Sequence, residues 1–376
     1  MRIVRIAGTL TVMAALWLAI GVSSVSAAAV VKTITVGAGP VAVSSDGTHV
    51  WVTNAGDTVS EIDASTGKVV KTIPVGSSPA YGVSSDGTHV WVADTGGDTV
   101  SEIDASTGTV VNTIPVGNAP YGVSAHGTHV WVTNTGGDTV SEIDASTGTV
   151  VRKIKVGSSP DGVSSDGTHV WVANGFKHGT VSEIDASTGK VVKKIKVGKD
   201  PEDVSSDGTH VWVANYGGDK VIEIDASTGT VVRKIKVGRR PFGVSAHGTH
   251  VWVTNSYGDT VSEIDASTGK VVRKIKVGRR PFGVSSDGTH VWVANDRGGS
   301  VSEIKIGKRW VVPKLTGRTL AAANTALKQA DCAVGKITKR KSSTVPKGRV
   351  ISSSPKAGSE HRAGTKVALT VSRGKH

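Results

Sequence analysis

Histidine beside carboxylates is a side-chain combination that proteins often use for metal binding and proton transfer. In this chain of 376 residues, seven histidines each follow a Gly-Thr pair: His49, His89, His129, His169, His210, His250 and His290. They stand 40 or 41 residues apart, so no two of them have the short spacing of a zinc motif. Such regular repetition favours a structural role, and we expect neither a bound metal ion nor a cofactor.

One histidine departs from this pattern. His178 lies in a loop of residues 174–179 that is one residue longer than its counterparts, and it follows Phe176 and Lys177. We expect this loop to lie near an acidic cluster made of Asp161, Asp200, Glu202 and Asp203. Such a group could bind a cation or an amine, and in an enzyme it would be the place to look for acid–base catalysis. The alternative is a solvated polar patch. The chain has no Ser-His-Asp elbow and no Gly-rich phosphate loop.

The elements that position these residues follow from a tryptophan repeat. Val-Trp-Val occurs seven times, centred on Trp51, Trp91, Trp131, Trp171, Trp212, Trp252 and Trp292. A period near 40 residues, with only strand-like segments inside each repeat, predicts an all-β fold, a β-propeller with one small sheet per repeat. In residues 41–76 we expect four strands joined by three turns, of which Asp46-Gly47 forms the first.

The repeats are offset in a way that predicts how the ring closes. The inner hairpin occurs seven times, and the last repeat ends at Ile306 without an outer strand. Residues 30–36 read like the missing outer strand but precede the first repeat. We therefore predict seven blades, with residues 30–36 completing the seventh, because this overlap removes exposed strand edges.

The repeat resembles that of a known family. Residues 51–54, 131–134 and 252–255 all read Trp-Val-Thr-Asn, which is similar to the Tyr-Val-Thr-Asn signature of YVTN propeller repeats, with Trp in place of the usual Tyr. The sequences of residues 58–63 and 72–76 fit the same pattern. The resemblance covers residues 30–307. It implies a secreted or surface β-propeller and no single activity.

The two faces of such a disc differ in sequence. The first and third turns of each repeat share one face and barely vary, whereas the second turns and the connections between blades share the other face and vary freely. Binding residues are often found on loops that a rigid scaffold positions. The alternative is drift in loops under little constraint. On this variable face we predict a ligand-binding site made of Tyr81, Tyr121, Asp161, Phe176, Lys177, His178, Glu202, Arg240, Phe242, Arg280 and Phe282.

Residues 310–374 form a second unit. Thr319 is the predicted N-cap of a helix that runs to Ala330, and three strand-like segments follow. The unit resembles a PASTA domain, the module found on penicillin-binding proteins and bacterial serine/threonine kinases, at residues 312–313, 317, 319–320, 334–335, 345–348, 355, 357–358 and 371–372. This resemblance implies a small α+β domain that contacts peptidoglycan or its precursors.

Residues 1–28 are typical of a secretory signal peptide. Arg2 and Arg5 precede an apolar run from Ile6 to Ile20, and small residues follow before a cleavage point near Ala28. The alternative is an uncleaved membrane anchor. After cleavage we expect no stable membrane span and a secreted, wall-associated protein. Cys332 is the only cysteine, so it cannot form an internal disulfide, and we expect it to be a small buried side chain.

Positive charge is concentrated in the C-terminal unit. Residues 308–376 contain 16 Lys and Arg against 2 Asp and Glu, which favours anionic partners. Our leading hypothesis is a wall-associated binding or scaffold protein. In it, the C-terminal unit contacts peptidoglycan or another anionic wall polymer, and the variable face of the propeller binds an unknown ligand or protein.

Two alternatives remain open. The first is a propeller enzyme of lactonase or lyase type. The second is single-stranded nucleic-acid binding by the basic aromatic loops, Arg239, Arg240 and Phe242 with Arg279, Arg280 and Phe282. The predicted export signal argues against nucleic acid as a partner.

Overall fold

The computed structural model describes residues 28–79, 81–175, 179–306, 309–330, 332–362 and 365–375. Apart from Ala28, the predicted signal peptide lies outside these described residues. They fall into two compact units, one within Ala27–Lys308 and one within Arg309–His376. In the described part of the chain, no helix is both long enough and apolar enough to cross a membrane.

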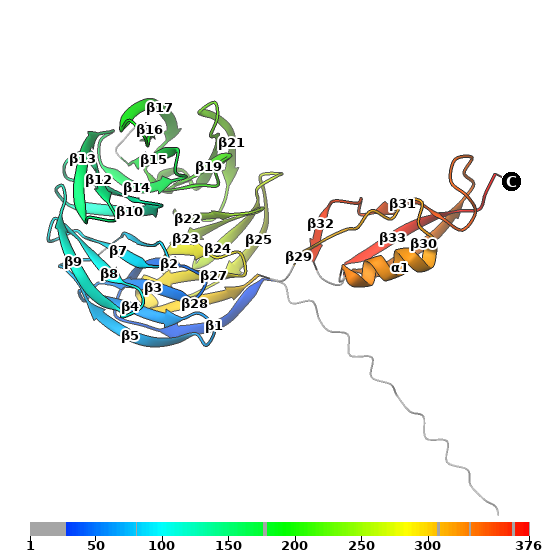
Figure 1. Ribbon diagram of the computed structural model, residues 1–376, viewed down its shortest axis with the longest axis horizontal. Helices are drawn as coiled ribbons and strands as arrows, with labels where there is room; N and C mark the ends of the chain where they lie inside the picture. The colour runs from blue at the N-terminus through cyan, green and yellow to red at the C-terminus, as the bar shows by residue number, and fades with distance from the viewer. Residues whose placement is uncertain are drawn as a thin grey trace, which may run out of the picture. The chain divides into compact units, whose positions relative to one another are not determined.

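The first unit is a ring of seven four-stranded antiparallel sheets, the blades (Figure 1). Blade 1 consists of β2 (Pro40–Ser45), β3 (His49–Asn54), β4 (Thr58–Asp63) and β5 (Lys68–Pro74). Blade 2 consists of β6 (Val83–Ser85), β7 (His89–Asp94), β8 (Thr99–Asp104) and β9 (Thr109–Pro115). Blade 3 consists of β10 (Pro120–His126), β11 (His129–Asn134), β12 (Thr139–Asp144) and β13 (Thr149–Lys155). Blade 4 consists of β14 (Pro160–Ser165), β15 (His169–Asn174), β16 (Gly179–Asp185) and β17 (Lys190–Gly198).

The remaining blades repeat the same order. Blade 5 consists of β18 (Pro201–Ser206), β19 (His210–Asn215), β20 (Lys220–Asp225) and β21 (Thr230–Lys236), with the short 3-10 turn η1 (Tyr216–Gly218). Blade 6 consists of β22 (Pro241–His247), β23 (His250–Asn255), β24 (Thr260–Asp265) and β25 (Lys270–Lys276). Blade 7 consists of β26 (Pro281–Ser286), β27 (His290–Asn295), β28 (Ser300–Lys305) and β1 (Ala29–Thr35), with the 3-10 turn η2 (Asp296–Gly298).

The N-terminal strand closes the ring. β1 pairs antiparallel with β28, and this pairing places Ile34 opposite Val301. Ile34 is only 5% exposed and packs in one apolar cluster with Trp292 of blade 7 and Val50 of blade 1. The predicted seven-bladed architecture and its closure by the N-terminal strand are therefore confirmed.

The hydrophobic core is divided into layers between neighbouring blades. The repeated tryptophans are all at most 1% exposed. Trp51 of blade 1, for example, packs against Val90, Val92 and Ile103 of blade 2. Because each tryptophan packs on the next blade, no blade has a complete core by itself, which is why a repeat architecture must be closed or capped.

The first turn of most blades is held by an aspartate. Asp46 accepts hydrogen bonds through Oδ1 from the backbone N–H of Thr48 and His49, and through Oδ2 from Nε1 of Trp51 at 3.2 Å. His49 joins the same frame, with Nδ1 3.1 Å from the Thr48 hydroxyl and Nε2 3.8 Å from Oε1 of Glu61. These contacts give the hairpin histidine a structural role.

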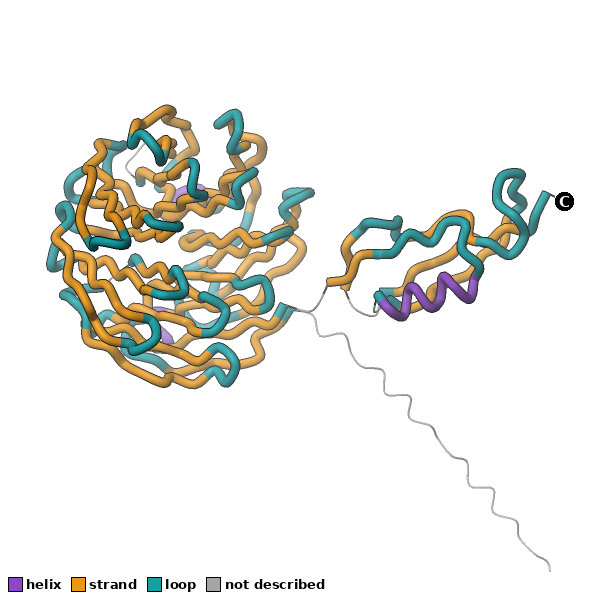
Figure 2. Tube along the Cα trace, viewed as in Figure 1, coloured by secondary structure: helices purple, strands orange, loops and turns teal. Residues whose placement is uncertain are grey.

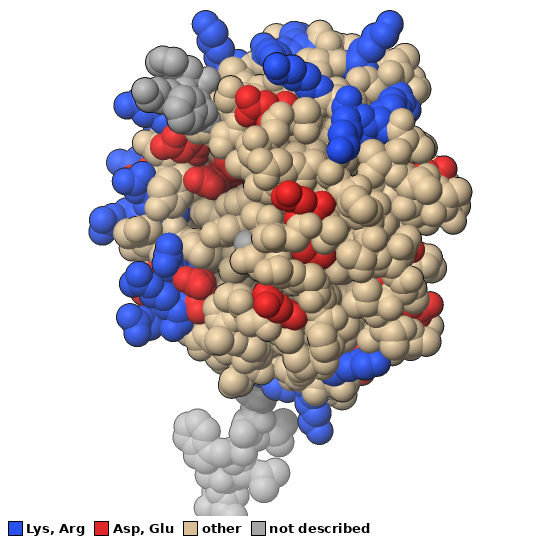
Figure 3. All heavy atoms as spheres, turned by 90° about the vertical axis from the view of Figure 1, so that its left-hand side faces the viewer, with Lys and Arg blue, Asp and Glu red and all other residues tan. Residues whose placement is uncertain are grey.

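Charge is arranged unevenly around the disc. In the face seen in Figure 3, Lys and Arg gather toward the edge, and Asp and Glu lie further inward. The outermost strand of each blade is an edge strand with unpaired backbone groups, and in β17 the exposed Val192 is followed by Lys193 and Lys194. Charged side chains on such strands oppose pairing with other chains.

The second unit is a small α+β fold (Figure 2). It contains β29 (Arg309–Val311), α1 (Leu320–Gln329), β30 (Ala333–Arg340), β31 (Val350–Ser354), β32 (Glu360–Arg362) and β33 (Lys366–Ser372). β33 lies between β30 and β31, parallel to the former and antiparallel to the latter. The Thr319 hydroxyl accepts a hydrogen bond from the Ala322 N–H at the start of α1, as expected for an N-cap. Cys332 is 5% exposed in the apolar core, as predicted.

Candidate ligand-binding mouth of the propeller

One variable residue of each blade lies where the inner strands meet on the variable face. In blade 3, Pro120 pairs with Asn134, and the register then shifts before Val123, so Tyr121 stands outside the regular ladder. A cavity of about 110 Å³ lies here, lined by inner-strand residues of every blade. We call this region the mouth and define it by the residues at this repeat position, Val41, Tyr81, Tyr121, Asp161, Glu202, Phe242 and Phe282.

Glycine follows the variable residue in most blades because the inner strands approach closely. A Cβ atom on Gly122 would lie 2.5 Å from the carbonyl oxygen of Asp161, a distance that no side chain tolerates. Blade 5 has Asp203 at this position instead. Its carboxylate accepts hydrogen bonds from the backbone N–H of Val204 at 2.8 Å and of Val244 at 2.9 Å. Asp203 thus ties blade 5 to blade 6.

The aromatic residues of the mouth form one cluster across the ring. The Tyr81 and Tyr121 rings stack with centroids 4.1 Å apart, and the Phe242 and Phe282 rings lie 4.4 Å apart. Tyr81 links the two pairs, because its ring centre is 6.0 Å from that of Phe242. Aromatic pairs at these distances attract each other. The structure therefore brings together four predicted site residues that come from blades 2, 3, 6 and 7.

Carboxyl groups with raised pKa values occupy the mouth on blades 4 and 5. Burial, together with the charges of Glu202 and Asp200, raises the pKa of Asp161 to about 8. Burial and the charges of Asp200 and Asp203 raise the pKa of Glu202 to about 7. Burial raises the pKa of Asp203 to about 6, although its two N–H donors oppose the rise. Groups that titrate near neutral pH can exchange protons with a ligand or bind its amine.

Arginine side chains lie further around the ring, at the connections that lead into blades 6 and 7. The Arg240 guanidinium lies 4.7 Å from the centre of the Tyr216 ring, and that of Arg280 lies 4.8 Å from the centre of the Phe282 ring. These cation–π contacts use aromatic surface within the protein, and Phe282 is only 6% exposed. Less ring surface is therefore free for stacking bases than the nucleic-acid hypothesis requires.

Three predicted site residues, Phe176, Lys177 and His178, lie outside the described residues. Within the residues that the structure does describe, no group of three or more His, Cys, Asp or Glu side chains is placed to hold a metal ion. The mouth thus combines carboxyl groups, a central aromatic cluster and guanidinium groups, an arrangement suited to a ligand with polar ends and an apolar or ring-shaped middle.

Reasoning from the sequence missed a second hollow on the same face. It lies between blades 6 and 7 and includes Ser256, Tyr257 and Arg297. The sequence feature that could have revealed it is the second turn of blades 6 and 7. These turns contain Tyr257 and Arg297, whereas the second turns of blades 1 to 3 contain mostly Gly, Thr or Ala. The contribution of the interblade glycines to the mouth was also missed, although Gly follows the variable residue in five of the seven blades.

Comparison with known protein families agrees with both resemblances noted in the sequence. Residues 311–373 match the PASTA domain, and residues 80–166 match the YNCE-like beta-propeller. The chain combines a YNCE-like, YVTN-type β-propeller segment with a C-terminal PASTA domain. PASTA domains bind peptidoglycan-like ligands and are typically extracytoplasmic.

Two individual proteins extend this comparison. A probable serine/threonine-protein kinase of Clostridium acetobutylicum is 41% identical over 63 residues, which are 17% of this chain and 10% of the kinase. The chain thus spans only about a tenth of the length of that relative. The solved structure of Kuenenia stuttgartiensis hydrazine synthase superimposes with a TM-score of 0.64 at 22% identity, over 71% of this chain and 95% of that one. This likeness concerns the propeller fold alone.

Proposed function

We propose that the protein is a secreted, cell-wall-associated binding protein. In this proposal the PASTA domain contacts peptidoglycan or another anionic wall polymer, and the mouth of the propeller binds a second ligand or a protein. The observation that carries the first part is the PASTA domain at residues 311–373. Its excess of Lys and Arg adds a long-range attraction for anionic polymers.

The chemistry of the mouth supports the second part. Three rings of the aromatic cluster, Tyr81, Tyr121 and Phe242, are only half-buried, so they offer an apolar platform. Asp161 and Glu202 stand beside it and could accept hydrogen bonds or pair with an amine. Most other exposed aromatic or acidic positions of the propeller repeat from blade to blade, whereas these vary, as expected for a surface that recognises one particular ligand.

The proposal is tested by co-sedimentation of the protein with purified peptidoglycan at two salt concentrations. The chain is compared with a variant that ends at residue 308, and circular dichroism checks that the propeller remains folded. This truncation removes no propeller strand, because β1 completes blade 7. Retention of the full chain alone supports wall binding through the PASTA domain. Equal behaviour of both forms contradicts it.

A charge-reduced variant separates specific binding from general attraction. Lys336, Lys339 and Arg340 are replaced by Gln, because β30 is largely exposed and the apolar core is left intact. Exposed charges lose most of their effect at high salt. Retention that persists in this variant and at high salt indicates specific recognition, whereas retention that disappears in both indicates an electrostatic interaction only.

An enzyme is the second candidate, and one observation favours it. The pKa of Asp161 is about 8 and that of Glu202 about 7, which suits general acid–base catalysis near neutral pH. A panel of lactones and acidic polysaccharides would be incubated with the protein and with the Asp161→Asn variant. Turnover that Asp161→Asn abolishes, with the melting temperature retained, would establish an enzyme. The absence of turnover in the unaltered protein would remove support for a lactonase and for a polysaccharide lyase.

A further inference from the structure

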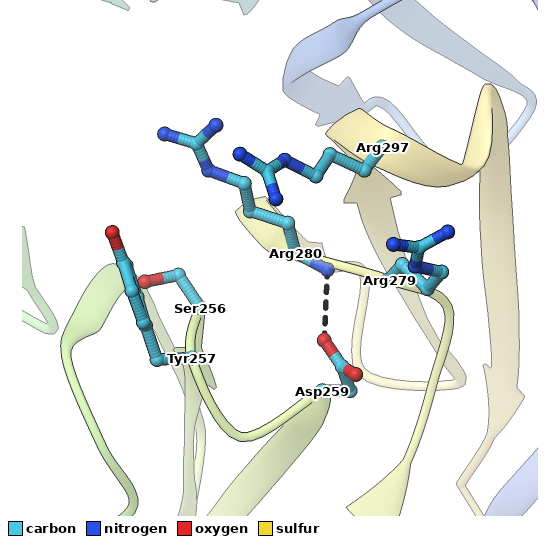
Figure 4. Close-up of a pocket in the computed structure, with 6 residues that line it drawn as sticks. All are labelled: Ser256, Tyr257, Asp259, Arg279, Arg280 and Arg297. Atoms are coloured by element: carbon cyan, nitrogen blue, oxygen red, sulfur yellow. Dashed lines mark hydrogen bonds between the residues drawn. The ribbon is translucent and has the colours of Figure 1, made fainter.

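A second pocket opens on the variable face, outside the mouth. It has a volume of about 270 Å³ and lies between blades 6 and 7 (Figure 4). The second turn of blade 6, the connection to blade 7 and η2 contribute its lining, which consists of Ser256, Tyr257, Asp259, Arg279, Arg280 and Arg297.

The pocket has more positive than available negative charge. Nη1 of Arg280 lies 3.4 Å from Oδ2 of Asp296. Within the described residues, no carboxylate lies within 4.0 Å of the guanidinium of Arg279 or Arg297. Oδ1 of Asp259 accepts the backbone N–H of Arg280 at 2.9 Å, and the two carboxylates Asp259 and Asp296 face three guanidinium groups, which leaves one positive charge in excess. The guanidinium ends of Arg280 and Arg297 point to the same side in Figure 4, whereas Arg279 turns away from them.

Arg280 also has a buried donor without an acceptor. Its Nε is shielded from solvent and has no hydrogen-bond partner among the described residues. Buried donors in folded proteins are almost always paired, and an unpaired one requires an explanation, such as an ordered water or a bound ion. An anionic oxygen in the pocket would supply this acceptor and would also reduce the repulsion between the Arg280 and Arg297 guanidinium groups.

The fold itself does not require arginine at position 280. The equivalent positions of blades 2, 3 and 4 keep the same left-handed backbone, with φ between 50° and 56°, and are held by the same aspartate contact to the backbone N–H. In blade 1, a glycine occupies the position with φ 60°. In blades 1 to 4 the residues at this position are Gly39, Ser78, Ala119 and Ser159; blade 5 has Asp200, and blade 6 again has an arginine, Arg240. The side chain of Arg280 is therefore not needed to form the turn.

We propose that this pocket binds a phosphate group, held mainly by Arg280 and Arg297. The planar guanidinium presents paired N–H donors that match phosphate oxygens. A phosphodiester of an anionic polymer and a free phosphate offer the same chemistry to these donors. This inference concerns a pocket beside the mouth, which shares Arg280 with it through the contact to Phe282, and it does not depend on wall binding by the PASTA domain.

Isothermal titration calorimetry on the full chain tests the proposal. Inorganic phosphate, a poly(glycerol phosphate) oligomer and acetate are titrated separately at an ionic strength near 0.15 M, which screens the diffuse charge of the PASTA domain. Two variants disrupt the site, Arg297→Ala and Arg280→Gly. Glycine is well suited to the left-handed backbone at position 280, so this variant is expected to fold. The matched control is Lys199→Ala, which removes one positive charge from the equivalent connection before blade 5.

We expect one saturable site for a phosphate probe. Arg297→Ala and Arg280→Gly should each weaken it roughly tenfold or more, as for the loss of a charge-assisted hydrogen bond, and Lys199→Ala should change it less than about twofold. Tighter binding of the oligomer identifies a polymer phosphodiester, and tighter binding of inorganic phosphate identifies a small soluble phosphate. The proposal is overturned by the absence of saturable phosphate binding, by preferential binding of acetate, or by an equal loss in Lys199→Ala.

Discussion

Tyr81 and Tyr121 stack across the junction of blades 2 and 3, with ring centroids 4.1 Å apart and ring planes 14° from parallel. Such pairs contribute about 0.5–1.5 kcal/mol beyond the burial of each ring. In urea unfolding, we expect a double-mutant cycle of Tyr81→Ala and Tyr121→Ala to give a coupling free energy of this size. Tyr121→Phe keeps the ring and is the control. Additive effects of the two alanine substitutions would show that the rings do not stabilise each other.

Asp94 makes the stability of the propeller dependent on pH. It is fully buried in blade 2, at a position where the other six blades have Asn. Burial raises its pKa to about 6, despite hydrogen bonds from the Ser101 and Thr99 hydroxyls. The folded protein therefore keeps this proton at pH values where the unfolded chain has lost it. The free energy of unfolding should fall as the pH rises from about 4 to about 6, and then level off.

Asp94→Asn should remove this pH dependence. At pH 7.5 the variant is expected to be more stable than the parent by about 1–3 kcal/mol, because one pKa unit corresponds to about 1.4 kcal/mol. Below about pH 4 the difference should vanish. The measurement is urea denaturation across this pH range. Asp219→Asn, in the second turn of blade 5, is the control for the loss of one charge, because Asn keeps the oxygen that accepts the Arg240 N–H. An equal stability gain at pH 4 and pH 7.5 would contradict the explanation.

Blades 3 and 6 have a histidine where the other blades have the turn aspartate. In blade 6 this residue is His247, and the buried Nε1 of Trp252 has no hydrogen-bond partner among the described residues. In blade 5, by contrast, Asp207 accepts the hydrogen bond of Trp212 Nε1 at 3.2 Å. His247→Asp should restore the missing acceptor and raise the free energy of unfolding by about 1 kcal/mol, and Asp207→Ala should lower it by about 1–3 kcal/mol.

Thermal and urea unfolding of His247→Asp and Asp207→Ala would show whether an aspartate that accepts the tryptophan N–H stabilises the blade. His126→Asp in blade 3 provides a second, independent position. The histidine turns have a geometry of their own, because His247 pairs with His250 and Gly248 has φ 58°, whereas the turn glycines of the aspartate blades have φ of 83–91°. If His247→Asp and His126→Asp both destabilise the protein, aspartate does not fit this geometry, and the expectation is wrong.

Closure of the ring depends on the inward side chains of β1. Ile34 is 5% exposed and packs with Trp292, whereas Val31 on the same strand is 52% exposed. Ile34→Ala should lower the free energy of unfolding by about 2–4 kcal/mol, and the matched Val31→Ala should change it by less than about 0.5 kcal/mol. Similar effects of the two substitutions would mean that β1 contributes little to the core that joins blade 7 to blade 1.

The architecture could be predicted from the sequence because it depends on local, repeated signals. The period of Trp51 and its equivalents, the Asp-Gly turns and the alternation within each strand all act over a few residues. Residues 30–36 could then be predicted to be the closing strand, because they precede the first repeat and the last repeat has no outer strand of its own. The same local logic placed the helix after Thr319 and the buried Cys332 of the PASTA domain.

The arrangement of the mouth depended on the tertiary structure. Tyr81 and Phe242 are 161 positions apart in the sequence, and their 6.0 Å ring separation arises only because the closed ring brings distant blades to one axis. The pKa values of Asp161 and Glu202 depend on burial and on neighbouring charges, which no spacing in the sequence reveals. The sequence by itself determined which residues vary around the disc; the closed ring decided which of them meet, because blades far apart in the chain converge only at the centre.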